Sequence, residues 1–174
     1  EEGIIEERRK KLQLLRDKKK AYVNDFLKDH YALNLHENYD GFSKEELAAK
    51  NEENVSIAGR IVLMRVMGNA SFATVRDSSG DIQMYVSKNT VDLETYEDFK
   101  TWDLGDIVGV RGKLFKTKTD ELTIEASEVV LITKSIRPTA FRHHRRGSVH
   151  RALGLGIPQA RHAGPASGDD QRLR

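Results

Sequence analysis

The sequence predicts an all-β domain with flanking helices, made of five strands with one helix between the third and the fourth. Three observations carry this prediction. Apolar and polar residues alternate in four of five strand-like segments between residues 55 and 132, which is typical of strands with one buried face. Residues 92–102 interrupt the series with helical spacing, and residues 1–50 have helix and turn signals instead.

The first strand is expected over residues 55–66. Its apolar residues of one parity are Val55, Ile57, Ile61 and Leu63. Gly59 lies among them, and a glycine inside a strand indicates a bend or a bulge. Residues 71–87 then form a hairpin that turns at Ser78, Ser79 and Gly80.

The helix at 92–102 has Asp92 as its expected N-cap, with Leu93, Tyr96, Phe99 and Lys100 at helical spacing. Two further strands are expected at 106–116 and 121–132. Five strands with a helix between the third and fourth predict a five-stranded OB-fold barrel, over residues 51–138. Closure of a barrel gives each strand one inner and one outer face, which accounts for the alternation.

Residues 1–50 form an N-terminal helical and strap segment before the barrel. A helix is expected over residues 4–20, with Ile5, Leu12 and Leu15 on one stripe and many Lys and Arg elsewhere. A charge run is usually a solvated face, and the alternative is a face toward phosphates. The following segment, residues 22–42, is the strap. It is expected to be irregular, with Phe26 and Leu27 packed on the barrel. Ser43 and Glu46 have the spacing of a capping box, so a short helix begins there.

The hairpin has a large aromatic residue, Phe72, on its polar face. With the turn at Ser78–Ser79, Phe72 opposes Tyr85, and two polar pairs continue the same outer face: Thr74 with Gln83, and Arg76 with Asp81. OB folds bind oligonucleotides on this surface, and an aromatic ring there can stack on a base. The amide of Gln83 can discriminate a base edge, and Arg65 can donate to a phosphate or a base carbonyl. The alternative is a cross-strand aromatic pair that stabilises the sheet without a ligand, and spacing alone leaves both interpretations open.

Composition limits the remaining functions. No apolar run approaches 18 residues and no signal-peptide stretch occurs, which argues against a membrane span. There is no cysteine, and no metal-ligand spacing predicts a metal site. Residues 1–140 have 22 Lys and Arg against 25 Asp and Glu, whereas residues 141–174 have seven Arg against two Asp, so the barrel itself is not a generally basic surface.

Residues 139–174 are expected to be a poorly ordered tail rich in Arg, His and Gly, because no periodicity survives there. Residues 141–174 contain no Lys and no Glu, although both are abundant before them, and one interpretation is a shifted reading frame. His143, His144 and His150 are interpreted as solvated side chains, with a weak adventitious metal site as the less favoured alternative.

Several stretches together resemble the anticodon-binding domain of bacterial-type lysyl-tRNA synthetases. They are "VSIAGRIVLMRVMGNASFATVRDSSGDIQMYV", "FKTWDLGDIVGVRGKLFKTKTDELTI" and "LITKSIRP", with "YVNDFLKDH" and "YDGFSKEEL" before them. The resemblance covers about residues 4–138. Aspartyl-tRNA synthetases share the spacing from Phe72 to Gln83 but lack the "KGKLFKTKTGELSI"-like motif. They are therefore the second family by resemblance.

The resemblance implies roles for individual residues. Phe72 stacks on the central anticodon uridine, and Arg65, Gln83 and Glu121 contact anticodon bases. The implied phosphate contacts are Arg8, Arg9, Lys116 and Lys118. Asp120 stands where the family usually has a glycine, and Asp is among the residues that tolerate a positive φ.

The resemblance also implies a cytoplasmic protein that binds lysine-accepting tRNA, from a family of homodimers. The family's class II catalytic domain binds ATP with Mg²⁺, and its motifs have no counterpart after Pro138. This chain by itself is therefore expected to bind no ATP or Mg²⁺ and to form no lysyl-adenylate. Two alternatives stay open: a stand-alone single-stranded RNA-binding module, and a module for a dimer or domain interface.

Overall fold

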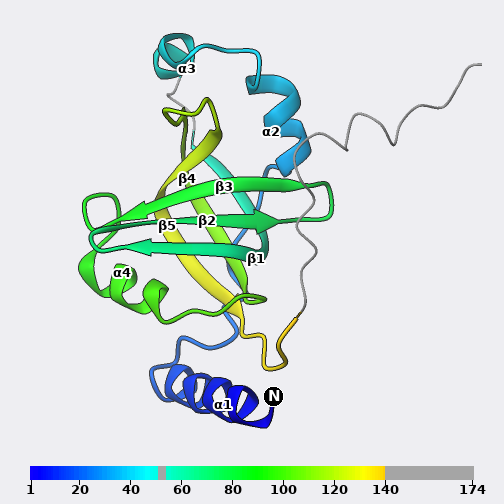
Figure 1. The fold of residues 1–174 in the computed structure, drawn as a ribbon, viewed down its shortest axis with the longest axis vertical. Coiled ribbons are helices and arrows are strands. Elements are labelled where there is room, and N and C mark those ends of the chain that lie inside the picture. The colour runs from blue at the N-terminus through cyan, green and yellow to red at the C-terminus, as the bar shows by residue number, and fades with distance from the viewer. Residues whose placement is uncertain (51–53, 140–174) are drawn as a thin grey trace, which may run out of the picture. The chain divides into compact units, whose positions relative to one another are not determined.

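The computed structural model describes residues 1–50 and 54–139. Five strands close into a barrel in the order β1-β2-β3-β5-β4, with all pairs antiparallel except β3 with β5 (Figure 1). The elements are α1 (Glu2–Asp17), α2 (Ala32–Tyr39), α3 (Lys44–Lys50), β1 (Val55–Met67), β2 (Ala70–Arg76), β3 (Asp81–Ser87), α4 (Leu93–Lys100), β4 (Ile107–Lys116) and β5 (Leu122–Thr133). The predicted OB-fold order of strands and helix is confirmed.

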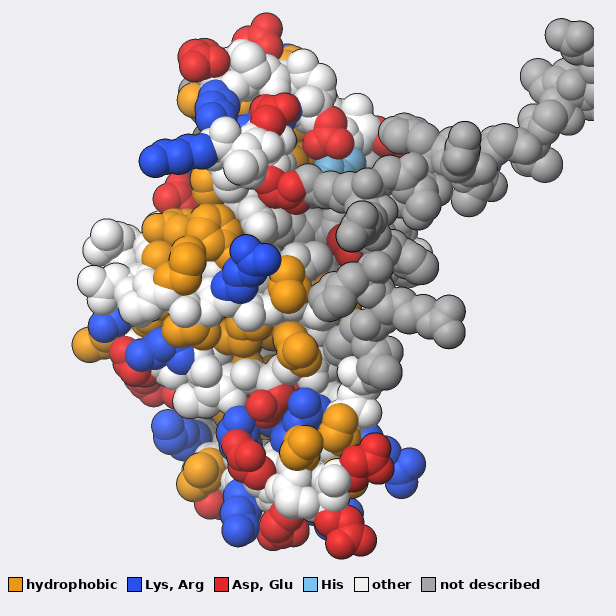
Figure 2. Space-filling model, in the orientation of Figure 1, with side chains coloured by type: hydrophobic (Ala, Val, Ile, Leu, Met, Phe, Trp, Pro, Cys, Tyr) orange, Lys and Arg blue, Asp and Glu red, His pale blue; other side chains and the backbone are white. Residues whose placement is uncertain are grey.

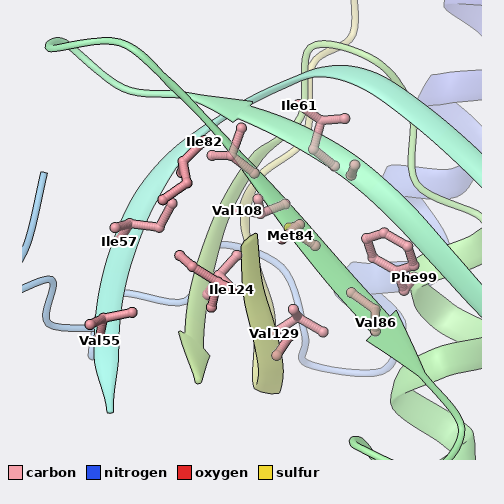
Figure 3. Close-up of a cluster of buried hydrophobic side chains, with 14 of the residues drawn as sticks. Val55, Ile57, Ile61, Ile82, Met84, Val86, Phe99, Val108, Ile124 and Val129 are labelled. Atoms are coloured by element: carbon pink, nitrogen blue, oxygen red, sulfur yellow. The ribbon is translucent and has the colours of Figure 1, made fainter. Parts of the chain in front are cut away.

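The core lies inside the barrel and is built from the inward-facing residues of all five strands. Ile57, Val75, Ile82, Met84 and Ile124 are fully buried there, and Figure 3 shows Ile57 of β1, Ile82 and Met84 of β3 and Ile124 of β5 pointing toward one another. Helix α4 adds Tyr96 and Phe99, which are also fully buried, to the same cluster. Burial of each large apolar side chain contributes about 1.5–3 kcal/mol, so this interior holds the barrel together.

Local signals fix two of the helix starts as predicted. Ser43 and Glu46 exchange the two hydrogen bonds of a capping box, at 2.8 and 3.2 Å. The Asp92 carboxylate accepts from the Thr95 backbone N–H at 2.8 Å, at the N-terminus of α4. Helix α1 ends at Asp17, earlier than expected.

The strap before the barrel departs from the prediction in two ways. It contains α2, where only irregular chain was expected, and Leu27 is 72% exposed instead of packed. Phe26 does lie on the barrel, directly over Gly109, where a Cβ atom would meet the ring at 2.6 Å.

Helix α2 was not predicted because the groups that cap its N-terminus lie elsewhere in the chain. The carboxylate of Asp77, in the β2–β3 turn, accepts from the backbone N–H of Ala32 at 2.8 Å. The hydroxyl of Ser79 accepts from the N–H of Leu33 at 3.0 Å. Two otherwise unpaired helix N–H groups are thus satisfied by the hairpin tip, which no local pattern reveals.

Strand β1 contains a bulge between Ile61 and Leu63, not at Gly59. Ile61 and Val62 are both buried, and the parity then reverses, so Met64 packs against the core and Leu63 does not. The expectation that Leu63 shares the inner face is therefore wrong. Gly59 has another role: a Cβ atom there would lie 2.5 Å from the carbonyl oxygen of Arg76.

Among the described residues, no helix has both the length and the apolar character needed to cross a bilayer. Two segments lie outside the described residues: 51–53, at the start of the barrel segment, and 140–174 of the predicted tail. The second includes His143, His144 and His150, whose solvated state was predicted.

Candidate nucleic-acid interface

The outer face of the hairpin has the register that the sequence predicts. Phe72 opposes Tyr85, Thr74 opposes Gln83, and Arg76 opposes Asp81. The Phe72 and Tyr85 side chains are half-buried, with ring centroids 5.1 Å apart and planes tilted by 56°. Figure 2 shows hydrophobic side chains gathered over this region of the surface, with basic side chains among them. The cross-strand pair of Phe72 with Tyr85 is therefore present. The Phe72 ring is also partly accessible to a ligand.

The bulge in β1 brings Arg65 onto this face. Arg65 is the register partner of Phe72 across the β1–β2 pair, and its side chain is exposed. Without the extra residue, strand alternation would turn Arg65 toward the barrel interior. An arginine and an aromatic residue therefore lie side by side on neighbouring strands.

Gln83 is held by a buried threonine on the other side. Thr123 of β5 is the register partner of Gln83 and is fully buried. Its hydroxyl lies 2.9 Å from Oε1 of the Gln83 amide. The amide is thus anchored at one of its two branches while its side chain stays half-exposed.

The aromatic surface includes a third ring, that of Phe115, which the sequence did not predict. Phe115 of β4 packs edge-on against Tyr85, with centroids 6.0 Å apart and planes at 79°. Phe115 is half-buried and lies on the polar parity of its strand, like Phe72. That shared signal could have identified it, whereas nothing in the pattern marks Thr123.

Arg76 and Asp81 close the other end of the hairpin face. The guanidinium Nε and Nη2 donate to the two carboxylate oxygens at 2.6 and 2.9 Å. The hydrogen bonds to Asp81 raise the pKa of Arg76 above its ordinary value. This paired charge is already neutralised, so Arg65 is the better phosphate or base donor on the face.

Glu121 lies in the turn between β4 and β5. It is two residues before Thr123, which is the register partner of Gln83. Asp120 has φ of +61°, which confirms that this position takes the conformation favoured by glycine. The backbone N–H of Thr117 donates to the carbonyl of Glu121 at 3.0 Å, and this bond fixes the turn. Lys118 lies in the same turn and is exposed.

Two expected phosphate contacts need correction. The Lys116 side chain is only 4% exposed, and its ammonium donates to the carbonyl of Asp40 at 2.7 Å and pairs with Asp120 at 3.2 Å. It anchors the strap to the barrel, because its parity directs it inward. It is therefore not free to meet a phosphate.

Arg8 is likewise buried, at 8% exposure. Its guanidinium donates to the carbonyls of Ser135 and Arg137 at 3.1 and 3.2 Å. These bonds tie α1 to the chain that leaves β5, so Arg8 has a structural contact where a phosphate contact was expected. Arg9, its neighbour on α1, is exposed.

A buried charge cluster reinforces the same junction. Lys134 donates to both Asp103 and Asp106, at 2.7 Å for Asp106, and Lys11 of α1 donates to Asp103 at 3.1 Å. Burial alone would raise the pKa of Asp103, but the hydrogen bonds from Lys134 and Lys11 outweigh it and lower that pKa. The cluster holds α1 against the loop between α4 and β4.

Within residues 1–50 and 54–139, no three His, Asp or Glu side chains converge in a way that could hold a metal ion. The described interface consists of aromatic, amide and guanidinium groups, which suit stacking and hydrogen bonding to nucleobases.

The barrel has sequence similarity to a known family. Residues 55–132 match the tRNA anti-codon family, described as an OB-fold nucleic acid binding domain. Residues 55–132 are therefore similar in sequence to that family, and they form the OB fold that its description names. Arg65, Phe72, Gln83 and Thr123 all fall within the matched range.

The chain is also similar to lysine–tRNA ligases of three bacteria. It is 52% identical over 145 residues to the enzyme of Laribacter hongkongensis, 51% over 144 to that of Chromobacterium violaceum, and 49% over 144 to that of Methylobacillus flagellatus. Each alignment covers 83% of this chain but only 28–29% of the relative. The resemblance to lysyl-tRNA synthetases is thereby confirmed, for a chain that spans less than a third of their length.

Proposed function

We propose that this OB-fold domain binds the anticodon loop of lysine-accepting tRNA as the anticodon-reading part of a lysine–tRNA ligase. The observation that carries the proposal is the half-exposed Phe72 ring, flanked by Arg65 on β1 and near the Gln83 amide on β3. An unpaired base can stack on the ring while its edge meets the guanidinium and the amide. The similarity to lysine–tRNA ligases supports lysine as the tRNA identity.

Each residue then has a distinct role. Phe72 stacks on the central anticodon uridine, and stacking of this kind is worth about 1–3 kcal/mol per base. Arg65 and Gln83 hydrogen-bond the stacked base or its neighbour, and Glu121 contacts an anticodon base from the β4–β5 turn. Lys118 and Arg9, both exposed, are the candidates for phosphate contacts.

The wider setting belongs to the same proposal. The domain acts in the cytoplasm within a homodimeric ligase, and a separate catalytic domain supplies the chemistry of ATP and Mg²⁺. The residues of this chain recognise and position RNA, and take no part in forming lysyl-adenylate.

A titration with anticodon stem-loops at two salt concentrations tests the proposal. A stem-loop with a uridine-rich lysine anticodon should bind more tightly than the same stem-loop with a changed central base. Binding should also weaken as salt rises, because phosphate contacts release counterions. Equal binding of both stem-loops would favour a general single-stranded RNA module, and no binding would favour a dimer or domain interface.

A further inference from the structure

Gln83 has a threonine on each side on the outer face of the barrel. Thr74 of β2 opposes it across the hairpin, and Thr123 of β5 opposes it across the parallel pair. Thr123 is fully buried, and its hydroxyl lies 2.9 Å from Oε1 of the amide. Thr74 is half-exposed. The two sides of Gln83 are therefore chemically similar in sequence but differ in burial.

The Thr123 hydroxyl can donate one hydrogen bond, and its direction bears on the orientation of the Gln83 amide. The hydroxyl has a single hydrogen, and it lies near two acceptors: Oε1 of Gln83, and the carbonyl of Glu121 at 3.1 Å. That carbonyl already accepts from the N–H of Thr117 at 3.0 Å. Two oxygens 2.9 Å apart need a proton between them, so the hydroxyl donates to Gln83.

A side-chain amide has its acceptor and its two donor hydrogens on separate branches. When Oε1 accepts from Thr123, the Nε2 branch is directed away from Thr123. The group offered to a ligand is then an N–H donor, and its complement is a carbonyl oxygen on the edge of a base. Uracil has a carbonyl at position 4, whereas cytosine has an amino group there.

We propose that Thr123 is a positioning residue for base selection: its buried hydroxyl orients the Gln83 amide so that its N–H group faces the base and selects a carbonyl edge over an amino edge. This inference rests on the proposed function, because it assigns a specificity role within the same site. Thr123 itself does not touch the RNA.

The test compares stem-loops that differ only in a central uridine or cytidine, bound to the full chain and to its variants. Thr123→Val keeps the shape but removes the hydroxyl, so the amide can rotate and present either group. The preference for uridine over cytidine should fall about five- to tenfold, the effect of one hydrogen bond. Thr123→Ser restores the hydroxyl and should restore the preference. Thr74→Val is the matched control, since it alters the other neighbour of Gln83 and should leave the preference unchanged.

A second variant keeps the test decisive where Thr123→Val folds poorly. Gln83→Glu has an acceptor on both branches, so one oxygen accepts from Thr123 and the other faces the base. The preference should then reverse toward cytidine.

The outcomes separate the two proposals. A wild-type chain that prefers uridine, with Thr123→Val preferring it equally, overturns this inference and leaves the proposed function intact. Retained uridine preference in Gln83→Glu also overturns it. A wild-type chain that binds both stem-loops equally overturns the inference together with the proposed anticodon recognition.

Discussion

Arg65 lies directly across from Phe72 on neighbouring strands, and it does so because one extra residue is inserted into β1 between Ile61 and Leu63. The bulge reverses the parity of the strand, turning Met64 inward and Arg65 outward. A cation and an aromatic plate are therefore adjacent on the surface where this fold family binds nucleic acid.

Phe72→Ala should weaken anticodon stem-loop binding by about 1–3 kcal/mol, because the ring supplies the stacking surface for one base. The thermal midpoint should be nearly unchanged, because the side chain is half-exposed and lies outside the core. Tyr31→Ala, which removes another exposed aromatic ring, serves as the control and should bind normally. A large loss of folding stability with unaltered binding of the folded fraction would identify Phe72 as a structural residue.

Arg65→Ala should lower the affinity for the stem-loop about tenfold, the effect of a charge-assisted hydrogen bond. Repeating the titration over a range of salt distinguishes the target of the guanidinium. A phosphate contact reduces the slope of log K against log salt by about one, whereas a base contact leaves the slope unchanged. Arg111→Ala is the control, because Arg111 pairs with Glu128 at 2.8 Å on another part of the barrel. Equal binding by wild type and Arg65→Ala would remove Arg65 from the site.

Asp77→Ala should reduce the free energy of unfolding by about 1–2 kcal/mol, through loss of the cap on α2. Burial alone would raise the pKa of Asp77, but hydrogen bonds from Ser79, Ala32 and Gly80 outweigh it and lower that pKa. A carboxyl with a lowered folded-state pKa contributes stability above its unfolded pKa. This contribution is lost as pH falls through the folded pKa.

Chemical denaturation of wild type and Asp77→Ala at several acidic pH values checks this prediction. The difference between the two proteins should be full at neutral pH and should shrink as the solution becomes more acidic. Asp25→Ala, at an exposed strap position, should show no such difference. A difference independent of pH would contradict the ionic role of Asp77.

Lys134→Met should destabilise the protein by about 3–5 kcal/mol, because it leaves the fully buried Asp106 and the partly buried Asp103 without their shared ammonium. The measurement is equilibrium unfolding in urea. Lys113→Met, at an exposed position of β4, should change stability by no more than about 0.5 kcal/mol. Similar effects of both variants would show that the buried cluster is not a stabilising feature.

Several features followed from the sequence alone because they depend on neighbours in the chain. Strand alternation identified the barrel, and the position of the turn set the register of Phe72 with Tyr85. The capping signals at Ser43 and Asp92 were sufficient because each cap and the N–H it satisfies are three residues apart.

Other features were decided only by the tertiary structure, because each depends on a contact between distant segments. The cap of α2 comes from a turn 45 residues later in the chain. Arg8 and Lys116 look like free cations in the sequence, but packing buries them against carbonyl groups. The bulge that exposes Arg65 lies in the pairing of β1 with β2. The contact of the Thr123 hydroxyl with Gln83 joins β5 to β3. Local patterns set which faces of a strand are apolar, whereas closure of the barrel sets which polar groups stay open to solvent.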